Sequence, residues 1–138
     1  ALIKFHTMFL IPTYVARSTI HGMGVFTPLP IKKGTRLWEF NPAIDWQLSA
    51  KDLSQMPEPY QSKLRTYCYL NGEGLYVLCG DNARFMNHAD HPNCDDSSKH
   101  FTIARRDIAA HEELTSDYRD FDSESAALGA ELYRTRHP

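Results

Sequence analysis

The stretch from Asp81 to Cys94 constrains the fold of this 138-residue chain most, because it crowds polar side chains around one apolar pair. That pair is Phe85-Met86, and Asn87-His88 follows it directly. An amide beside an imidazole can donate and accept several hydrogen bonds in one small space. Pro92 then prevents a helix from continuing through the stretch. Taken alone, the pattern is also typical of an Asx-rich surface turn.

Length and composition indicate a single domain over residues 1–138. A chain of this size buries roughly 68% of the surface that its unfolded form exposes, so it can build its own core. The formal net charge of −2 argues against a broad nucleic-acid-binding face. The apolar run Met8–Ile11 is too short for a signal-peptide core or a membrane span. We therefore expect an intracellular protein, cytoplasmic or nuclear, that is not secreted and binds neither nucleic acid nor membrane.

The cysteines are three in number, and no two of them have CxxC spacing. This disfavours both a disulfide framework and a cysteine-based zinc site. We interpret Cys68, Cys79 and Cys94 as reduced thiols, most of them small core residues. His88 and His91 lack further ligands at suitable spacing, so they do not indicate a metal site.

A second informative stretch is Gly22-Met23-Gly24, which precedes Val25-Phe26. Two glycines around one residue, followed by two strand-forming residues, describe a tight loop that enters a β-strand. Glycine lets the main chain approach a ligand closely and adopt positive φ. The pattern differs from the dinucleotide-binding fingerprint, because the third glycine and the following helix are missing. On its own it is more often only a turn.

The third stretch is Glu112-Glu113-Leu114-Thr115-Ser116-Asp117-Tyr118. Together with Gly22–Gly24 and with Arg84–His88 followed by Pro92-Asn93, it resembles the motifs of the SET-domain lysine methyltransferases. The terminal motif of that family, Glu-Glu-Leu-Thr-x-Asp-Tyr, is matched at every fixed position. Each stretch alone has a structural explanation, but their order and spacing are hard to obtain by chance. The resemblance runs over about residues 14–118.

The resemblance implies a mainly β fold with short helices (α+β), of the SET-domain β-clip type. Its C-terminal pseudoknot would thread the terminal motif beneath a loop and bring Tyr118 to Asn87-His88. The residue patterns add strands at 36–40, 75–78 and 101–108, a hairpin turn at 31–35, and a helix capped by Ser49. Residues 119–138 are expected to form a C-terminal helical extension, with a helix from Ser123 to Tyr133.

The activity implied is transfer of a methyl group from S-adenosylmethionine to the ε-amine of a lysine in a histone, a histone-like protein or another intracellular protein. This displacement needs the neutral amine. At pH 7 its deprotonation costs about 4.6 kcal/mol, from an unperturbed lysine pKa of about 10.4. An apolar channel and the charge of the sulfonium both reduce that cost. Aromatic walls would exclude water and tolerate cationic methyl groups.

The resemblance assigns roles residue by residue. Tyr118 is the catalytic residue, whose phenol orients the amine and stabilises charge near the sulfonium. The cofactor contacts are Asn87 and His88, with the main chain of Gly22, Met23 and Gly24. Phe121 is a candidate wall of the lysine channel; Arg84 and Asp117 are expected to be structural, Arg84 through an ion pair. Further candidates for the channel or for cofactor stacking are Tyr67, Tyr69 and Tyr76.

The chain departs from the family where several members bind zinc. In those members a cysteine follows Asn-His-Ser and a cysteine-rich segment follows the terminal tyrosine. Here Ala89-Asp90 follows His88, and no cysteine occurs after Cys94. We therefore expect no metal, and a different cover for the channel: either the helix from Ser123 to Tyr133 or a homodimer partner. His111 stands where the family usually has glycine, and histidine adopts the left-handed conformation more readily than most residues.

Two other functions stay open from the sequence. In the first, the chain is a non-catalytic SET-fold module that binds cofactor, peptide or a partner protein. The missing cysteine-rich segment supports this alternative, and intact Tyr118 opposes it. A small hydrolase with Cys68 or Cys94 as nucleophile lacks any local signature.

Overall fold

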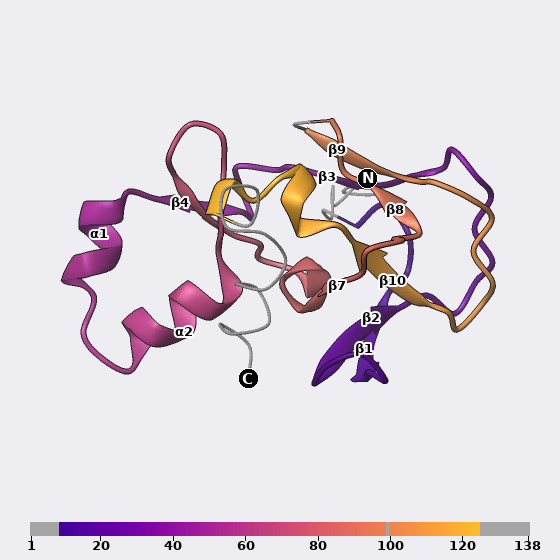
Figure 1. Cartoon of the computed structure of the whole chain (residues 1–138), viewed down its shortest axis with the longest axis horizontal. Helices are drawn as coiled ribbons and strands as arrows, with labels where there is room; N and C mark the ends of the chain where they lie inside the picture. Colours follow the sequence, from indigo (N-terminus) through magenta and orange to yellow (C-terminus); the bar gives the residue numbers. More distant parts are fainter. Residues whose placement is uncertain (1–8, 99, 125–138) are drawn as a thin grey trace, which may run out of the picture.

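The computed structural model describes residues 9–98 and 100–124. In this part of the chain the strands form three small β-sheets, and two short α-helices lie together at one end (Figure 1). The described strands are no longer than four residues each, which is the expected mainly β fold with short helices. Within the described residues, every helix is too short or too polar to cross a bilayer.

The sheet that carries the candidate site has the order β1-β2-β10-β7. Its strands are β1 (Tyr14–Arg17), β2 (Met23–Phe26), β10 (Glu113–Ser116) and β7 (Asn87–His88). β2 pairs antiparallel with both β1 and β10. β10 and β7 run parallel, so that Thr115 lies opposite Asn87 and Ser116 opposite His88. The last strand therefore joins all three sequence stretches, and it makes the contact that the expected pseudoknot requires.

In the other two sheets all strand pairs are antiparallel. One has the order β3-β9-β8, with β3 (Arg36–Glu39), β9 (Phe101–Ala104) and β8 (Cys94–Asp95). The other has the order β4-β6-β5, with β4 (Trp46–Leu48), β6 (Tyr76–Leu78) and β5 (Tyr69–Leu70).

The helices begin and end where local chemistry allows it. Ser49 caps α1 (Ala50–Gln55) through a complete capping box with Asp52, as the sequence predicts. α2 (Tyr60–Tyr67) follows a proline, Pro59, at its N-cap. Two single 3₁₀ turns, η1 (Asn82–Phe85) and η2 (Tyr118–Asp120), flank the strands of the candidate site.

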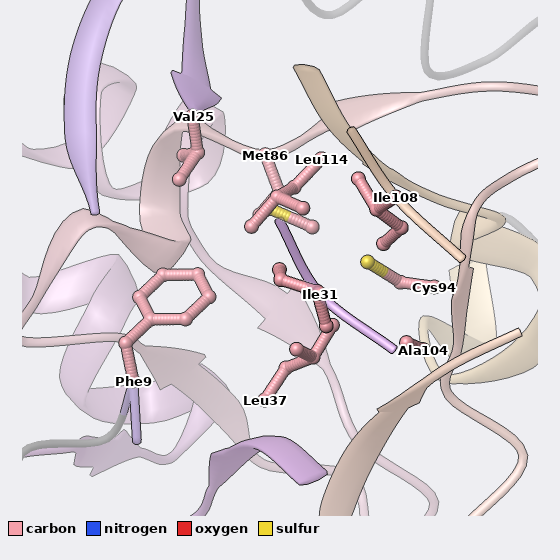
Figure 2. Close-up of a cluster of buried hydrophobic side chains, with 9 residues drawn as sticks. All are labelled: Phe9, Val25, Ile31, Leu37, Met86, Cys94, Ala104, Ile108 and Leu114. Carbon is pink, nitrogen blue, oxygen red and sulfur yellow. The ribbon is translucent and has the colours of Figure 1, made fainter. Parts of the chain in front are cut away.

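The hydrophobic core includes side chains of the site sheet (Figure 2). Val25 of β2 and Leu114 of β10 are fully buried in it, and Met86 packs among them. The remaining members come from distant parts of the chain: Phe9, Ile31, Leu37, Cys94, Ala104 and Ile108. Because Met86 is anchored in this core, the next two residues, Asn87-His88, are held in a defined position.

Three expectations from the sequence differ from the structure or fall outside it. Residues 31–35 form a turn, with Gly34 at φ 83°, but not a hairpin, because β2 and β3 belong to different sheets and Ile31 bridges Ile108. The strand predicted over 101–108 ends at Ala104, where the Arg105 N–H donates to the Asn93 carbonyl. The helix predicted from Ser123 to Tyr133 lies, beyond residue 124, outside the described residues.

Candidate active site

Asn87 ties the Gly22–Gly24 loop to the terminal motif. Its side chain is buried, and its amide nitrogen donates to the carbonyl oxygens of His21 and Met23, each at 3.0 Å. The same nitrogen lies 2.8 Å from Glu113 Oε1. An amide NH₂ has two hydrogens, so the three acceptors share them. One side chain thus holds the loop carbonyls on both sides of Gly22 and the last strand at once.

Glu113 is the second anchor of this loop, and the sequence analysis gave it no role. Ser18 Oγ lies 2.9 and 2.8 Å from the two carboxylate oxygens of Glu113. Ser18 also accepts from the N–H groups of Ile20 and His21, so it shapes the turn itself. The loop is therefore organised by the side chains of Ser18, just after β1, and of Glu113 on β10.

The two glycines of the loop are needed for different reasons. A Cβ on buried Gly24 would lie 2.1 Å from Glu113 Oε1, whereas one on Gly22 would meet no heavy atom within 4 Å. We expect Gly24→Ala to lower the free energy of unfolding by about 2–3 kcal/mol, because it displaces the carboxylate that Ser18 and Asn87 bind. Gly22→Ala should lower the free energy of unfolding by about 1 kcal/mol, because alanine is strained at the Gly22 φ of +47°. Urea unfolding measures both; equal losses would show that the Glu113 contact does not matter.

His88 is held by hydrogen bonds on both ring nitrogens. Its Nδ1 accepts from the backbone N–H of Tyr118 at 3.2 Å, and its Nε2 lies 3.1 Å from Asp90 Oδ1. Because Nδ1 is an acceptor, the ring hydrogen of neutral His88 sits on Nε2 and is donated to Asp90. This buried histidine therefore positions the backbone of Tyr118.

Tyr118 reaches both sides of the site. Its hydroxyl donates to the Met86 carbonyl oxygen at 2.6 Å, and its ring is tilted against His88 with the centroids 6.4 Å apart. On its other side the ring lies 4.8 Å from the ring of Phe121, between centroids. The structure thus brings Tyr118 together with Asn87-His88, although 30 residues separate His88 from Tyr118.

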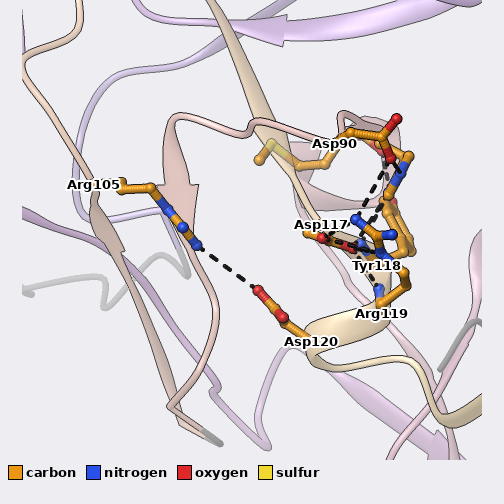
Figure 3. A network of polar contacts seen from close by, with 8 residues as sticks. Asp90, Arg105, Asp117, Tyr118, Arg119 and Asp120 are labelled. Carbon is orange, nitrogen blue, oxygen red and sulfur yellow. Dashed lines mark hydrogen bonds and ion pairs between the residues drawn. The ribbon is translucent and has the colours of Figure 1, made fainter.

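Charged side chains hold the turn that follows β10 (Figure 3). Asp117 caps η2 and its Oδ2 lies 2.6 Å from the Arg119 guanidinium, which is the main reason why the pKa of Asp117 is lowered. Arg119 also approaches Asp90 at 3.5 Å, and Arg105 lies 3.9 Å from Asp120. Asp117 therefore has the structural role that the sequence analysis expected.

A cavity of about 390 Å³ lies on the Phe121 side of Tyr118. The aromatic side chains that line it include Tyr67, Tyr69, Tyr118 and Phe121, and Tyr69 meets Phe121 edge-on at 5.1 Å between centroids. Burial raises the pKa of Tyr69, so its phenol stays neutral. Tyr76 does not line this cavity; its hydroxyl donates to Glu124 instead. Neither Asn87-His88 nor Gly22–Gly24 lines it, whereas Tyr118 both lines it and contacts His88 through its backbone N–H and its ring.

The ion pair expected for Arg84 is wrong. No acidic residue of the described chain forms an ion pair with it. The guanidinium lies 5.7 Å from the Phe85 ring centroid, and Arg84 lines the cavity. Its Nε is buried without a hydrogen-bond partner among the described residues.

The three cysteines are free thiols. Burial raises the pKa of Cys68 to about 11 and raises those of Cys79 and Cys94 as well. A cysteine nucleophile needs the thiolate, so these surroundings disfavour the hydrolase hypothesis. Among residues 9–98 and 100–124, no three His, Cys, Asp or Glu side chains are grouped as metal ligands.

Asn93 is a further anchor whose role the sequence analysis did not assign. Its side-chain nitrogen donates to the Glu113 carbonyl at 2.7 Å, and its Oδ1 accepts from the Thr115 N–H at 2.9 Å. The residue is almost fully buried, and it holds the Asp81–Cys94 stretch against β10. The sequence feature that could have indicated this role is the Pro92-Asn93 pair, which matches the family motif.

Comparisons with known proteins agree with this geometry. The SET domain family matches residues 22–119. A Plasmodium falciparum protein provisionally named histone-lysine N-methyltransferase 1 is 36% identical over 121 residues, covering 77% of this chain and 2% of that protein. Histone-lysine N-methyltransferase ash1 of Drosophila melanogaster is 34% identical over 108 residues, covering 70% of this chain and 5% of its own length. The chain thus spans a small part of these relatives.

A solved structure shares the fold. It is a humanized mutant of the Chaetomium thermophilum Polycomb Repressive Complex 2 bound to an inhibitor, with a TM-score of 0.61 and 21% identity. The match covers 82% of this chain and 15% of that one. With the family match over most of the chain and relatives above 30% identity, the conclusion is that this chain belongs to the SET-domain family.

Proposed function

We propose that this chain transfers a methyl group from S-adenosylmethionine to the ε-amine of a lysine in a protein. The observation that carries the proposal is the position of Tyr118, which lines the aromatic cavity and also contacts His88 of the Asn87-His88 pair. Such an arrangement suits two reactants that enter from opposite sides and meet at one phenol. The names of the relatives support histones or histone-like proteins as the substrate class and an intracellular location.

The residues present fit the cofactor that we propose. Gly22 and Met23 are exposed, and no heavy atom lies within 4 Å of the position of a Cβ on Gly22, so a ligand can approach this main chain closely. Asn87, His88 and the main chain of Gly22–Gly24 would hold S-adenosylmethionine, which supplies an electrophilic methyl group when bound. We expect no metal.

The chain's own side chains would then prepare the lysine. The aromatic walls exclude water and disfavour the ammonium form. Burial therefore lowers the pKa of the lysine and increases the fraction of neutral amine. The phenol oxygen of Tyr118 is fixed by its donation to the Met86 carbonyl, so it can accept a hydrogen bond from the amine and orient its lone pair. Phe121 packs on the Tyr118 ring and limits the room beside the amine, where we propose that it lines the lysine channel.

The test is incubation of the full 138-residue chain with methyl-labelled S-adenosylmethionine and a panel of purified histones, followed by amino-acid analysis. We expect label on methyllysine, and none on histones whose lysines have been acetylated chemically. Absence of label together with binding of S-adenosylhomocysteine in calorimetry would refute turnover. That result would favour the alternative, a non-catalytic module that holds the cofactor.

A further inference from the structure

Asp96, just beyond β8, is a partly buried acidic residue of the cavity that neither the motifs nor the proposed mechanism uses. It lines the same cavity as Tyr118. One carboxylate oxygen, Oδ1, accepts from the hydroxyl of Thr102. The other, Oδ2, is buried and has no hydrogen-bond partner among the described residues. An unpaired buried carboxylate oxygen is costly, so its retention needs an explanation.

The surroundings of Asp96 favour a positive partner. Burial raises the pKa of its carboxyl group, and the nearby carboxylates of Asp120 and Asp95 raise it further. The arginines that line the cavity, Arg65, Arg84 and Arg119, form no ion pair with it in the described chain. A cation that enters the cavity would therefore relieve both the unpaired oxygen and the repulsion from Asp95 and Asp120.

Asp96 lies on the face of the chain that Tyr118 also occupies. Ser116, which precedes Tyr118 by two residues, lines the same cavity as Asp96, and its side chain lowers the pKa of the Asp96 carboxyl group. Asp117 between them is extended, and side chains two apart on an extended chain point to the same side. The charge of Asp96 also raises the pKa of Tyr69, which belongs to the aromatic wall. Asp96 is thus an anionic group beside the aromatic walls of the cavity, which Glu73, Asp120 and Asp122 also line.

We propose that the Asp96 carboxylate binds the ammonium group of the substrate lysine in this cavity and positions it toward Tyr118. This inference rests on the proposed function. The ammonium donates an N–H to Oδ2, and the aromatic rings contact the methylene chain. Each methyl group already on the lysine removes one N–H donor, and a trimethylammonium has none. Asp96 therefore favours lysines that still carry hydrogen on the nitrogen.

The same contact provides a route to the neutral amine. The N–H bond that points at Oδ2 breaks, an O–H bond forms on Asp96, and the lone pair stays on the lysine nitrogen. Burial disfavours the charge on both partners, so this transfer costs less in the cavity than it does in water.

A binding experiment tests the proposal independently of turnover. The full chain is titrated with n-butylammonium chloride, a lysine side-chain analogue, while the amide NMR signals of Tyr69, Ser116 and Phe121 are followed. We expect millimolar binding, at least tenfold weaker binding of n-butyltrimethylammonium, and at least tenfold weaker binding of n-butylammonium to Asp96→Asn. The asparagine can still accept from Thr102, so the fold should hold, which the thermal midpoint checks. Glu73→Gln removes an equal charge at an exposed position of the same cavity and should change binding less than twofold.

The outcomes separate this inference from the proposed function. Binding of n-butylammonium to Asp96→Asn within twofold of wild type, or no binding to wild type, overturns the assignment. If wild type methylates histones, Asp96→Asn should raise KM by about tenfold or more, and kcat should fall as well because the variant lacks the proton acceptor. A wild-type chain that transfers no methyl group but binds n-butylammonium through Asp96 refutes the proposed reaction and retains the cation site.

Discussion

Tyr118→Phe should reduce methyl transfer to histones by about 10²- to 10³-fold, the range typical of losing one preorganised hydrogen-bonding group at a reacting centre. The substitution removes the hydroxyl that the Met86 carbonyl fixes in place, so nothing remains to orient the amine from this side. The aromatic ring, its packing on Phe121 and the backbone bond to His88 are all retained. We therefore expect the dissociation constant of S-adenosylhomocysteine to change less than threefold.

The measurements are single-turnover methylation with labelled S-adenosylmethionine and calorimetry with S-adenosylhomocysteine. The lost hydrogen bond should lower the free energy of unfolding by about 1 kcal/mol, which is too little to unfold the protein. Tyr60→Phe is the matched control, because it removes an exposed hydroxyl on α2, away from the cavity. Turnover of Tyr118→Phe within fivefold of wild type would remove the phenol from the mechanism.

Asn87→Asp should lower the free energy of unfolding by at least about 3 kcal/mol at pH 7, the range typical of an unpaired buried charge. The amide nitrogen that donates to two carbonyl oxygens and to Glu113 becomes an oxygen that can donate to none of them. A second carboxylate would then face Glu113 at hydrogen-bond distance. The Gly22–Gly24 loop should lose its anchor, so binding of S-adenosylhomocysteine should fall together with stability.

The sign of the pH dependence follows from the same repulsion. Burial beside Glu113 raises the pKa of the introduced carboxyl above its unfolded value of about 3.9. Its penalty is therefore absent below that value and grows as the pH rises through the folded pKa. We expect the difference from wild type in urea unfolding to be smaller at pH 4.5 than at pH 7.

Two further variants make this prediction specific. Asn71→Asp is the matched control, because Asn71 uses its Oδ1 to accept from the N–H groups of Glu73 and Leu75, and a carboxylate keeps both bonds. It should cost less than about 1 kcal/mol. Adding Glu113→Gln to Asn87→Asp should restore part of the loss, since the glutamine amide can donate to the new carboxylate. No recovery in the double variant would mean that Asn87 acts through the loop carbonyls alone.

Local sequence determined the features that depend on neighbouring residues. Ser49 and Asp52 form the predicted capping box, because both partners lie within one helical turn. His111 adopts a φ of 65° at the turn where the family usually has glycine. The Tyr14 hydroxyl lies 2.7 Å from its Nδ1. The order of three short motifs was enough to indicate the family and the mainly β fold. It was also enough to place Asn87, His88 and Tyr118 in one site before the structure was known.

The tertiary structure decided which side chains complete that site. The pairing of β10 with β7 sets Glu113 against Asn87, and Asn93 bonds to the backbone of β10; no local pattern reports a register between segments that distant. The assignment of residues 31–35 to a hairpin failed for the same reason, because strand pairing is a long-range choice. Asp96 acquires its significance only from the cavity that distant segments enclose around it. The sequence by itself therefore specified the chemical groups of this protein, while packing between remote segments determined which of them face each other.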